Sequence, residues 1–420
     1  GRLSDADALL SKILDDPYNR PVLPFAYFWK GEIGYRNNQL DTAIKYYHLY
    51  VDAGAPVSGE ANPVNARYNL GYAYLRKENY PVSLTFFEPL VKAPALNTDG
   101  FSQDAYIRAA DNYFMLKSFD RAKTMYDNVV KLSWPAEDYA TFQIAMLAGV
   151  RGPTEKISLM NTMIRKFPES PLVVDANMEI ANTYMANEKF RESIPFLLNV
   201  IKGTDNSSLI PQAYLKMGAA YYNIDNNAEA LKHFKTIVST YPNAPETEDA
   251  VDNIKTIYLE EGNPDEYASF MRQIGRPLSV NTEDSLTYFA AEKLYDDQKL
   301  NDALGAFNSY LQKFPSGSYT LDANFNRAEI YNAKKDWNNA VAAYEQVAAD
   351  APNKYAERAV LTAARINFFE LKNYARAEAF FGQLKQITSS QENKLEAMRG
   401  LLRCQYNQQK WTEASENAKE

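Results

Sequence analysis

The chain has 420 residues, of which 46% are apolar, 13% aromatic and 23% charged, and this excludes a disordered chain because a large core can form. A formal net charge of −8 and a pI near 5.2 disfavour nucleic acid as a partner, since phosphate binding requires clustered Lys and Arg. No apolar run approaches the roughly 20 residues that span a bilayer, which excludes a membrane-spanning segment.

The chain opens on a segment with one apolar helical face. Ala6, Leu10 and Ile13 follow an i, i+4, i+7 spacing, and Pro17 is expected to end the helix. We therefore expect residues 1–20 to be the second helix of an upstream repeat, and the chain to be a fragment of a longer protein.

The same stripe returns along the chain at a spacing of about 37 residues. A small residue begins it at Ala6, Ala43, Ser83, Ala122, Ser193, Ala230, Ala303, Ala340, Ala377 and Ala414. A large residue follows one helical turn later at Leu10, Tyr47, Phe87, Tyr126, Leu197, Phe234, Met271, Phe307, Tyr344 and Phe381. Prolines at 168, 242, 315 and 352 predict where several of these second helices end.

A further column of small residues, about twelve positions earlier, indicates a first helix in each repeat. Its members are Gly31, Gly71, Ala110, Ala145, Ala181, Gly218, Ala291 and Ala328. Lys255 and Arg365 depart from the column, so we expect distorted repeats there. Short polar turns such as 187–189, 225–227 and 334–336 separate the two helices, which predicts a helix-turn-helix unit.

Two insertions, residues 52–63 and 93–103, are rich in Gly, Pro and Asn and lie between repeats. Surface loops are the simpler interpretation, and partner contact is the alternative. After Ala414 the chain ends inside another second helix.

The spacing resembles the tetratricopeptide repeat, W-x2-L-G-x2-Y, then A-x3-F, then P. The closest unit spans 213–242, where Tyr214, Gly218, Tyr221, Ala230 and Phe234 occupy signature places, and 284–315 and 321–352 follow. The resemblance implies an all-α fold: a right-handed superhelical solenoid of about eleven helix-turn-helix repeats. It further implies one domain over 1–420, with repeats in 21–420 and the last one truncated.

A second resemblance concerns the junctions between repeats. Lys166-Phe167-Pro168, Thr240-Tyr241-Pro242 and Lys313-Phe314-Pro315 share one form, and each is followed by an Asp-Ala pair. They are similar to repeats in bacterial envelope proteins, namely the lipoprotein of the outer-membrane barrel-assembly machine and the periplasmic coordinator of the Tol-Pal system. The general alternative is that Pro stops a helix and Asp favours the next helix N-terminus. The resemblance implies the bacterial periplasm or outer-membrane periphery, with the cytoplasm as alternative and a lipid anchor possible outside the fragment.

No pattern in the sequence predicts catalysis, a cofactor or a metal. The only two histidines, His48 and His233, are far apart in sequence, and Cys404 is the single cysteine, so a zinc site of these ligands is not expected and neither is an internal disulfide. Adjacent acids such as Asp296 and Asp297 point to different sides of a helix and do not predict an acid–base pair. We expect a non-enzymatic protein.

In tetratricopeptide arrays the first helix of each repeat lines the concave surface, which implies an aromatic groove here. Its candidate partner-binding residues are Phe28, Tyr35, Tyr68, Tyr72, Phe114, Tyr222, Tyr288, Tyr295, Phe325 and Phe369. Exposed aromatic side chains near a few charges favour a peptide or protein partner. Two alternatives stay open: a glycan-binding surface accessory protein, and the interaction region of a larger regulator or enzyme.

Overall fold

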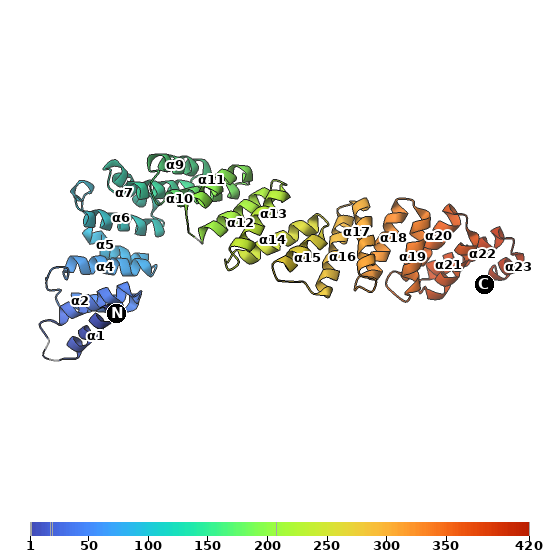
Figure 1. The fold of residues 1–420 in the computed structure, drawn as a ribbon, viewed down its shortest axis with the longest axis horizontal. Coiled ribbons are helices and arrows are strands. Elements are labelled where there is room, and N and C mark those ends of the chain that lie inside the picture. Colours follow the sequence, from blue (N-terminus) through green and yellow to red (C-terminus); the bar gives the residue numbers. More distant parts are fainter. Residues whose placement is uncertain (1, 17, 19, 207, 420) are drawn as a thin grey trace. The chain divides into compact units, whose positions relative to one another are not determined.

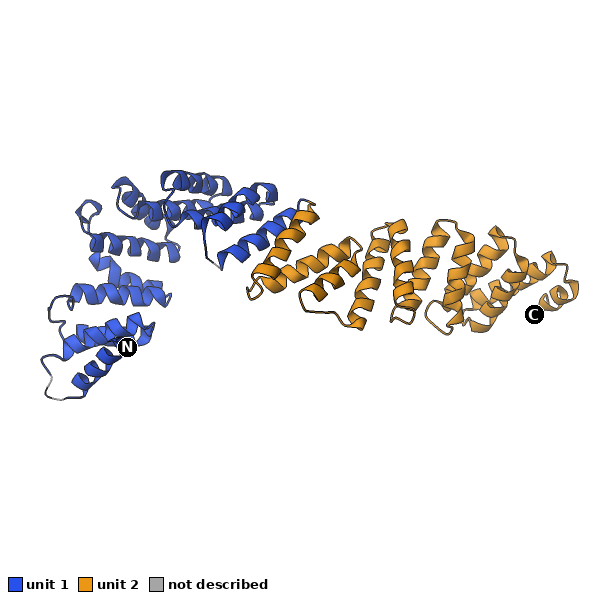
Figure 2. Cartoon of the chain, viewed as in Figure 1, with its two compact units in different colours: residues 1–224 blue, residues 225–420 orange. Residues whose placement is uncertain are grey.

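The computed structural model describes residues 2–16, 18, 20–206 and 208–419, and every regular element in these ranges is a helix (Figure 1). The predicted all-α solenoid class is confirmed. The chain divides into two compact units, residues 1–224 and 225–420 (Figure 2). That the whole chain forms one domain stays a prediction.

Even-numbered α-helices are the first helices of the repeats and odd-numbered ones are the second helices. The helices of the first unit are α1 Arg2–Asp15, α2 Leu23–Arg36, α3 Leu40–Asp52, α4 Pro63–Arg76, α5 Tyr80–Phe87, α6 Gly100–Met115, α7 Phe119–Lys131, α8 Glu137–Gly149, α9 Pro153–Lys166, α10 Val173–Ala186, α11 Phe190–Gly203 and α12 Leu209–Tyr222, with 3-10 turns η1 Glu88–Leu90 and η2 Pro94–Leu96. Pro17, the predicted end of α1, lies outside the described residues.

The second unit continues with the same alternation. Its helices are α13 Asn227–Thr240, α14 Thr247–Glu260, α15 Pro264–Gln273, α16 Val280–Asp296, α17 Leu300–Lys313, α18 Thr320–Ala333, α19 Trp337–Ala349, α20 Ala356–Arg365, the π-helix η3 Ile366–Glu370, α21 Tyr374–Ile387, α22 Gln391–Asn407 and α23 Trp411–Asn417. Within each unit a second helix packs on its own first helix and on the first helix of the next hairpin.

The predicted columns form the core of both units. The small residues of the second helices are buried from Ala43 to Ala414, and so are the large residues one turn later from Tyr47 to Phe381, whereas Ala6 and Leu10 of α1 are half-buried. Glycine is needed where the helices approach most closely: a Cβ built on Gly31 or Gly71 would lie 2.8 Å from the ring of Tyr47 or Phe87. The aromatic ring therefore occupies the volume that the small residue leaves free.

Most hairpin turns contain one residue in the left-handed region at the same position of the repeat, the α8–α9 turn being an exception, with Val150 at φ −66° and Gly152 extended at φ 169°. Within the two units these residues are Asn38, Glu78, Lys117, Glu188, Gly262, Gln298, Lys335, Lys372 and Gln409. In the α18–α19 turn the N–H of Asp336 donates to the carbonyl of Tyr331 at 2.9 Å, and that of Lys335 donates to Asn332 at 3.0 Å. These two bonds form a Schellman motif, which satisfies the last carbonyls of the first helix.

The repeat around Arg365 departs from regular geometry, as the sequence predicts. The π-helix that follows Arg365 accommodates one extra residue, so the fully buried Ala364 takes the small-residue place and Arg365 is exposed. The distortion expected around Lys255 does not occur. There α14 is a regular helix, because Ile254 and Ile257 fill the core on either side of the lysine.

The two insertions are loops that are only partly at the surface. In the first, Ala55 and Ala61 are buried, and the hydroxyl of the buried Tyr50 donates to the carbonyl of Pro56 at 2.6 Å. In the second, Asn97 is buried and its amide donates to the carbonyls of residues 92–94. The first loop therefore packs on the core of the hairpins that it connects, and the second is held together by its own hydrogen bonds.

Candidate functional site

Polar side chains connect successive first helices along one face of each unit, which we call the first-helix face. In the first unit Asp104 of α6 accepts hydrogen bonds of 2.6 Å from both Tyr68 and Tyr72 of α4. Asp111 of α6 accepts a bond of 2.9 Å from Tyr139 of α8. These bonds cross from one hairpin to the next, so they fix neighbouring side chains relative to each other.

The second unit has the same kind of connections. Tyr355, the residue before α20, donates to Asp322 of α18 at 2.7 Å, and Asn326 of α18 donates to the hydroxyl of Tyr288 of α16 at 3.3 Å. Further links run from Arg358 to Glu329, from Arg365 to Glu396, and from Asn393 to Glu357. The face is therefore preorganised before any partner binds.

Three buried tyrosines of second helices donate hydrogen bonds to carboxylates of this face and so orient them. Tyr47, Tyr126 and Tyr344 donate to Glu32, Asp111 and Glu329 at 2.9, 2.6 and 2.6 Å. Burial and the nearby carboxylate raise the pKa of each of these tyrosines, so the hydroxyls remain protonated donors. In each pair the carboxylate directly follows the small residue of the first helix, and we call these pairs the tyrosine–carboxylate pairs.

Arg108 lies at the centre of the first-unit cluster. Its guanidinium pairs with Asp111 at 2.5 Å and with Asp104 at 3.2 Å, and lies over the rings of Tyr72 and Tyr139 at 5.8 and 5.5 Å. Burial alone would lower the pKa of Arg108, but the charges of Asp111, Tyr72 and Asp104 raise it above its usual value. The cluster is thus a satisfied network that holds three first helices together.

The last part of the face contains a pocket with unpaired cations. It lies between η3 and α22 and is lined by Phe369, Leu395, Arg399 and Arg403 among others. Phe369 and Leu395 are about half exposed, at 52% and 46%. Neither Arg399 nor Arg403 makes an ion pair or a side-chain hydrogen bond with any described residue. This part of the face therefore offers open apolar surface beside guanidinium groups that no described carboxylate pairs with.

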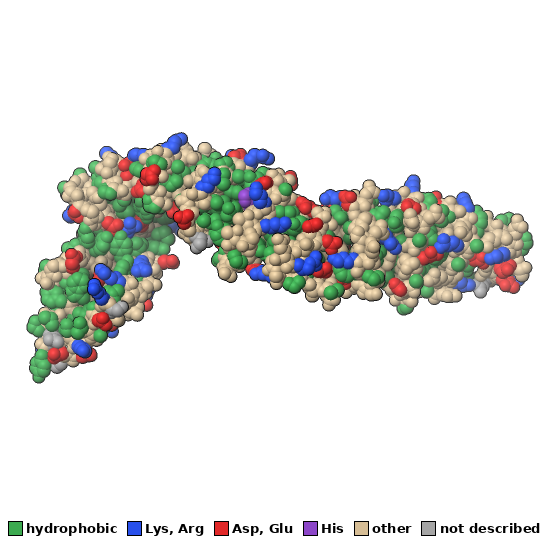
Figure 3. Space-filling view, viewed as in Figure 1, with side chains coloured by type: hydrophobic (Ala, Val, Ile, Leu, Met, Phe, Trp, Pro, Cys, Tyr) green, Lys and Arg blue, Asp and Glu red, His purple; other side chains and the backbone are tan. Residues whose placement is uncertain are grey.

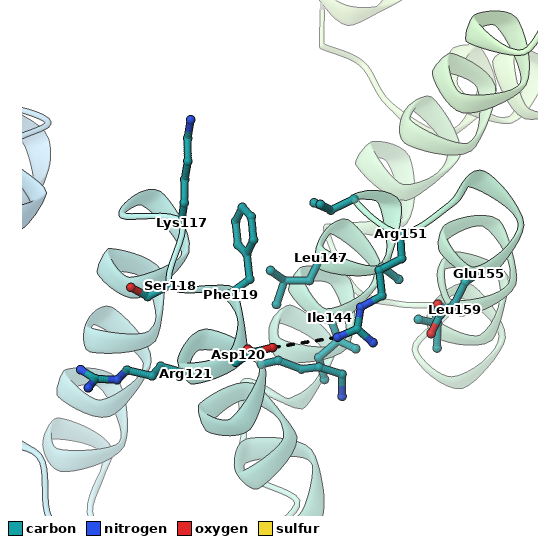
Figure 4. A pocket seen from close by; sticks show the side chains of 13 residues that line it. Lys117, Ser118, Phe119, Asp120, Arg121, Ile144, Leu147, Arg151, Glu155 and Leu159 are labelled. Atoms are coloured by element: carbon teal, nitrogen blue, oxygen red, sulfur yellow. Dashed lines mark ion pairs between the residues drawn. The ribbon is translucent and has the colours of Figure 1, made fainter.

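A second hollow lies at the turn edge of the first unit, between α7 and the end of α8 (Figure 4). Phe119 and Leu147 line its apolar side, and Arg151 approaches Asp120 to 4.0 Å across it. Lys117 and Arg121 extend away from this pair in Figure 4. Because Arg151 and Asp120 are both largely exposed, water screens their attraction and the pair contributes little to holding the hollow together.

Three of the ten predicted groove residues are buried in the core. Phe28, Tyr288 and Phe325 are at most 6% exposed, so little of each ring is available to a partner. All three lie three residues before the small column. That position directs the ring towards the hairpin's own second helix, as the contacts of Phe28 with Tyr50 (5.3 Å) and of Tyr288 with Tyr310 (5.7 Å) show. Tyr68 has the same position and also contacts its second helix, at Phe87, but it is only half-buried.

The other seven predicted residues keep exposed surface, and the structure brings two of them together. Tyr68 and Tyr72 lie 5.0 Å apart and share Asp104. Burial and Asp104 raise the pKa of Tyr68 to about 12. Five residues lie one turn after the small column and are half-buried, apart from the exposed Phe369: Tyr35, Phe114, Tyr222, Tyr295 and Phe369.

Sequence reasoning missed the carboxylates and cations that organise the face. Asp104, Arg108, Asp111, Asp322 and Glu329 were not among the predicted residues. A partial signal was available: in three of the four repeats where a carboxylate follows the small residue of a first helix, at Glu32, Asp111 and Glu329, the large residue of the second helix is Tyr. In the fourth, that large residue is Phe307, and Glu292 accepts from Tyr288 of its own helix instead. A buried phenol requires an acceptor, and the spacing supplies it.

Other kinds of site have little support in the described part of the chain. No three His, Cys, Asp or Glu side chains described here gather closely enough to hold a metal ion. His48 accepts from or donates to the hydroxyl of Tyr74 at 3.2 Å and contacts the ring of Phe86.

None of the described helices has the length and apolar character that crossing a membrane requires. On the face seen in Figure 3, acidic and basic side chains are interspersed over both units.

Comparisons with known proteins identify the repeat type. Residues 212–244 and 322–354 match the family model of the tetratricopeptide repeat. They coincide with two of the three units in which the sequence pattern is most complete. No curated protein matches the chain.

Several solved structures are similar to the chain at low identity. One is a tetratricopeptide repeat protein from Parabacteroides merdae, 14% identical, covering 64% of this chain and 98% of that one with a TM-score of 0.40. Another is the C-terminal part of a repeat protein from Cytophaga hutchinsonii, 18% identical, covering 70% and 98% with a TM-score of 0.36. A third is the TPR domain of P58(IPK), 15% identical, covering 92% and 98% with a TM-score of 0.26.

Proposed function

We propose that this chain is a non-catalytic scaffold that holds a peptide or protein partner along the first-helix face. The observation that carries the proposal is the series of hydrogen bonds and ion pairs between successive first helices. A face that is already ordered loses little conformational entropy when a partner binds, so more of the contact energy appears as affinity. The match of residues 212–244 and 322–354 to the tetratricopeptide repeat agrees with an interaction role.

The pocket between η3 and α22 is the part of the face that we propose contacts the partner most directly. Phe369 and Leu395 offer apolar area, and Arg399 and Arg403 offer free donors. Interface contacts of high energy are typically aromatic or Arg side chains beside apolar surface. In contrast, Arg108 is already paired with two carboxylates and acts on the face by holding its helices.

We further propose that the scaffold works in a bacterial cell-envelope assembly, in the periplasm or at the outer-membrane periphery. Support comes from the Phe-Pro and Tyr-Pro junctions, whose form is similar to repeats of envelope proteins. The full reading frame tests this: an upstream signal peptide followed by a lipidated Cys would agree. An attached DNA-binding or catalytic domain would instead favour the interaction region of a larger regulator or enzyme.

The glycan-binding alternative has less support from the site. Sugars stack on open aromatic faces, but Phe325 is stacked on Tyr355 at 4.0 Å and Arg358 lies over the same ring at 5.2 Å. Lys354 likewise lies over Tyr355 at 4.6 Å. Both rings are therefore occupied by protein side chains.

The partner site is tested by photo-crosslinking in the organism's own extract. A photoreactive phenylalanine analogue replaces Phe369 on the first-helix face in one variant, and replaces the exposed Gln386 of the second helix α21 in the other. We expect a discrete protein adduct from position 369 and none of the same mass from position 386.

Substitutions then test the same surface without a crosslinker. Phe369→Ala combined with Leu395→Ala and Arg399→Ala should release the adduct partner, while the melting temperature stays within a few degrees because the first two side chains are about half exposed and Arg399 is exposed. Identical adducts from positions 369 and 386, or a partner retained by the triple variant, would rule out this face.

A further inference from the structure

Arg327 of α18 is a cation without an ion partner. Its two terminal nitrogens donate to the side-chain carbonyl of Asn308 at 3.3 Å and to that of Asn324 at 2.8 Å. Its Nε is shielded from solvent and has no hydrogen-bond partner among the described residues. No carboxylate of the described chain lies within ion-pairing distance of it. Burial lowers the pKa of Arg327, which is the sign expected for a guanidinium whose charge is not compensated.

The equivalent position in another repeat shows what is missing. Lys30 of α2, like Arg327, directly precedes the small residue of its first helix, and it is buried. Its ammonium pairs with Asp7 at 2.8 Å and donates to Ser11 at 2.6 Å, both on the preceding second helix, α1. In the repeat of Arg327, the position of Ser11 is taken by Asn308.

The carboxylate is the element that differs. The position of Asp7 in that repeat is taken by Leu304, so the second helix offers Arg327 an amide but no anion. A partly buried guanidinium gains most from a carboxylate, because a charge-assisted bond compensates the loss of hydration. Arg327 is therefore suited to an acceptor that carries a negative charge.

Arg327 opens into a polar groove that we call the outer groove. It runs between the second helices α17 and α19, over the stripe of α18 formed by Thr320, Asn324, Arg327 and Tyr331. Its walls also carry the amides of Asn339 and Gln346. Both are exposed, and the Gln346 amide makes no hydrogen bond with a described residue. Asp350 lines the groove as well, and no ion pair joins it to Arg327.

These features favour an extended peptide over a small anion. Amide side chains both donate and accept, which is what an extended peptide backbone requires on each side. A groove with amides on its walls and Arg327 at its base suits an extended peptide that directs one acidic side chain towards Arg327.

We propose that the outer groove between α17 and α19 binds an extended peptide segment through a Glu or Asp side chain that pairs with Arg327. The carboxylate takes the role that Asp7 has for Lys30. The site lies on different helix surfaces from the first-helix face, so it is a second binding surface that does not depend on the scaffold function proposed above.

The binding test uses the full chain and a defined probe. Fluorescently labelled hexaglutamate amide is titrated at constant ionic strength, with hexaglutamine amide as the neutral counterpart. We expect preference for hexaglutamate and a loss of roughly tenfold in affinity for Arg327→Gln, the size expected for one hydrogen-bonded charge pair. Arg191→Gln, an exposed arginine of α11, changes the net charge equally and should bind like the unsubstituted protein.

A probe-free test places the carboxylate within the chain. Leu304→Asp should pair with Arg327 as Asp7 pairs with Lys30, raising the melting temperature relative to Leu304→Asn, which loses the same packing without adding charge. The difference should vanish when both are combined with Arg327→Gln. Leu304→Asp should also abolish hexaglutamate binding, whereas Leu304→Asn should retain it.

The outcomes separate this proposal from others. Equal affinities of the unsubstituted protein and Arg327→Gln for hexaglutamate, or no preference over hexaglutamine, would overturn it. Displacement of the peptide by succinate at matched carboxylate concentration would show a small-anion site instead of a peptide groove. The Phe369, Leu395 and Arg399 substitutions should leave hexaglutamate binding unchanged, so failure of one surface does not imply failure of the other.

Discussion

Replacing Gly400 with alanine tests how closely α21 and α22 pack. A Cβ built on Gly400 would lie 2.5 Å from Cδ2 and Cγ of Phe381, whose ring is 3% exposed. Ring and helix must therefore move apart, and such overpacking costs about 1–3 kcal/mol. The higher helix propensity of alanine stabilises a helix by about 0.8–1 kcal/mol relative to glycine. The difference of these two terms leaves Gly400→Ala destabilising by up to about 2 kcal/mol.

The neighbouring Gly382 supplies a matched control. It lies in α21 beside Phe381, and a Cβ there would approach nothing closer than Leu401 at 4.0 Å. Because alanine has the higher helix propensity and meets no clash here, Gly382→Ala should stabilise the folded protein by about 0.5–1 kcal/mol. The same substitution in two adjacent helices is thus expected to change the free energy of unfolding in opposite directions.

Hydrogen exchange is the appropriate assay, because repeats open locally and a global melting curve would average over the chain. We expect faster exchange of α21 and α22 amides in Gly400→Ala and slower exchange in Gly382→Ala. Phe381→Leu, which introduces the residue found at Leu197, should recover part of the loss when combined with Gly400→Ala. Equal protection in the two alanine variants would refute the packing argument.

Three further predictions concern single side chains. Tyr344→Phe removes the donor to Glu329 and should destabilise the second unit by about 1–2 kcal/mol, measured by urea unfolding. Hydrogen bonds from Thr388 and Asn393 lower the pKa of Glu357 below 4.5, so its contribution to stability is present above that pH and is lost as the pH falls through the folded pKa. Unsubstituted protein should therefore lose stability relative to Glu357→Gln between about pH 5 and pH 3 in acid titrations of the melting temperature. Burial raises the pKa of Cys404 to about 12, so its thiol should resist a disulfide reagent at pH 8 until urea unfolds the chain.

The hairpin architecture was predictable from the sequence because it depends on volume. Small residues recur where two helices approach, and rings such as Tyr47 and Phe87 recur opposite them, so periodicity alone located the core. The turns were harder to recognise. In most of them the left-handed residue is a Lys, Glu or Gln, as at Lys335, and only Gly262 carries the usual glycine signal.

The site was only partly predictable, because the sequence pattern did not show which positions of a first helix face the groove and which face the second helix of the same hairpin. Several aromatic residues three positions before the small column, such as Phe28, were expected in the groove but are buried towards the second helix. Residues one turn after the column, such as Tyr35 and Phe369, keep exposed surface. Contacts between first helices, such as Tyr68 with Asp104, join residues of different repeats, and no pattern within one repeat encodes them.

The distribution of paired and unpaired charges gives a better indication of the partner than net charge does. The chain carries −8, which by itself would suggest a basic partner. Yet the carboxylates of the first-helix face that accept from tyrosines, such as Asp111, already have donors and are partly shielded from solvent. Arg399 and Arg327, in contrast, have donors that no carboxylate of the described chain uses. A partner gains most where a charge is uncompensated, so acidic or carboxylate-bearing segments should bind this acidic protein better than basic ones.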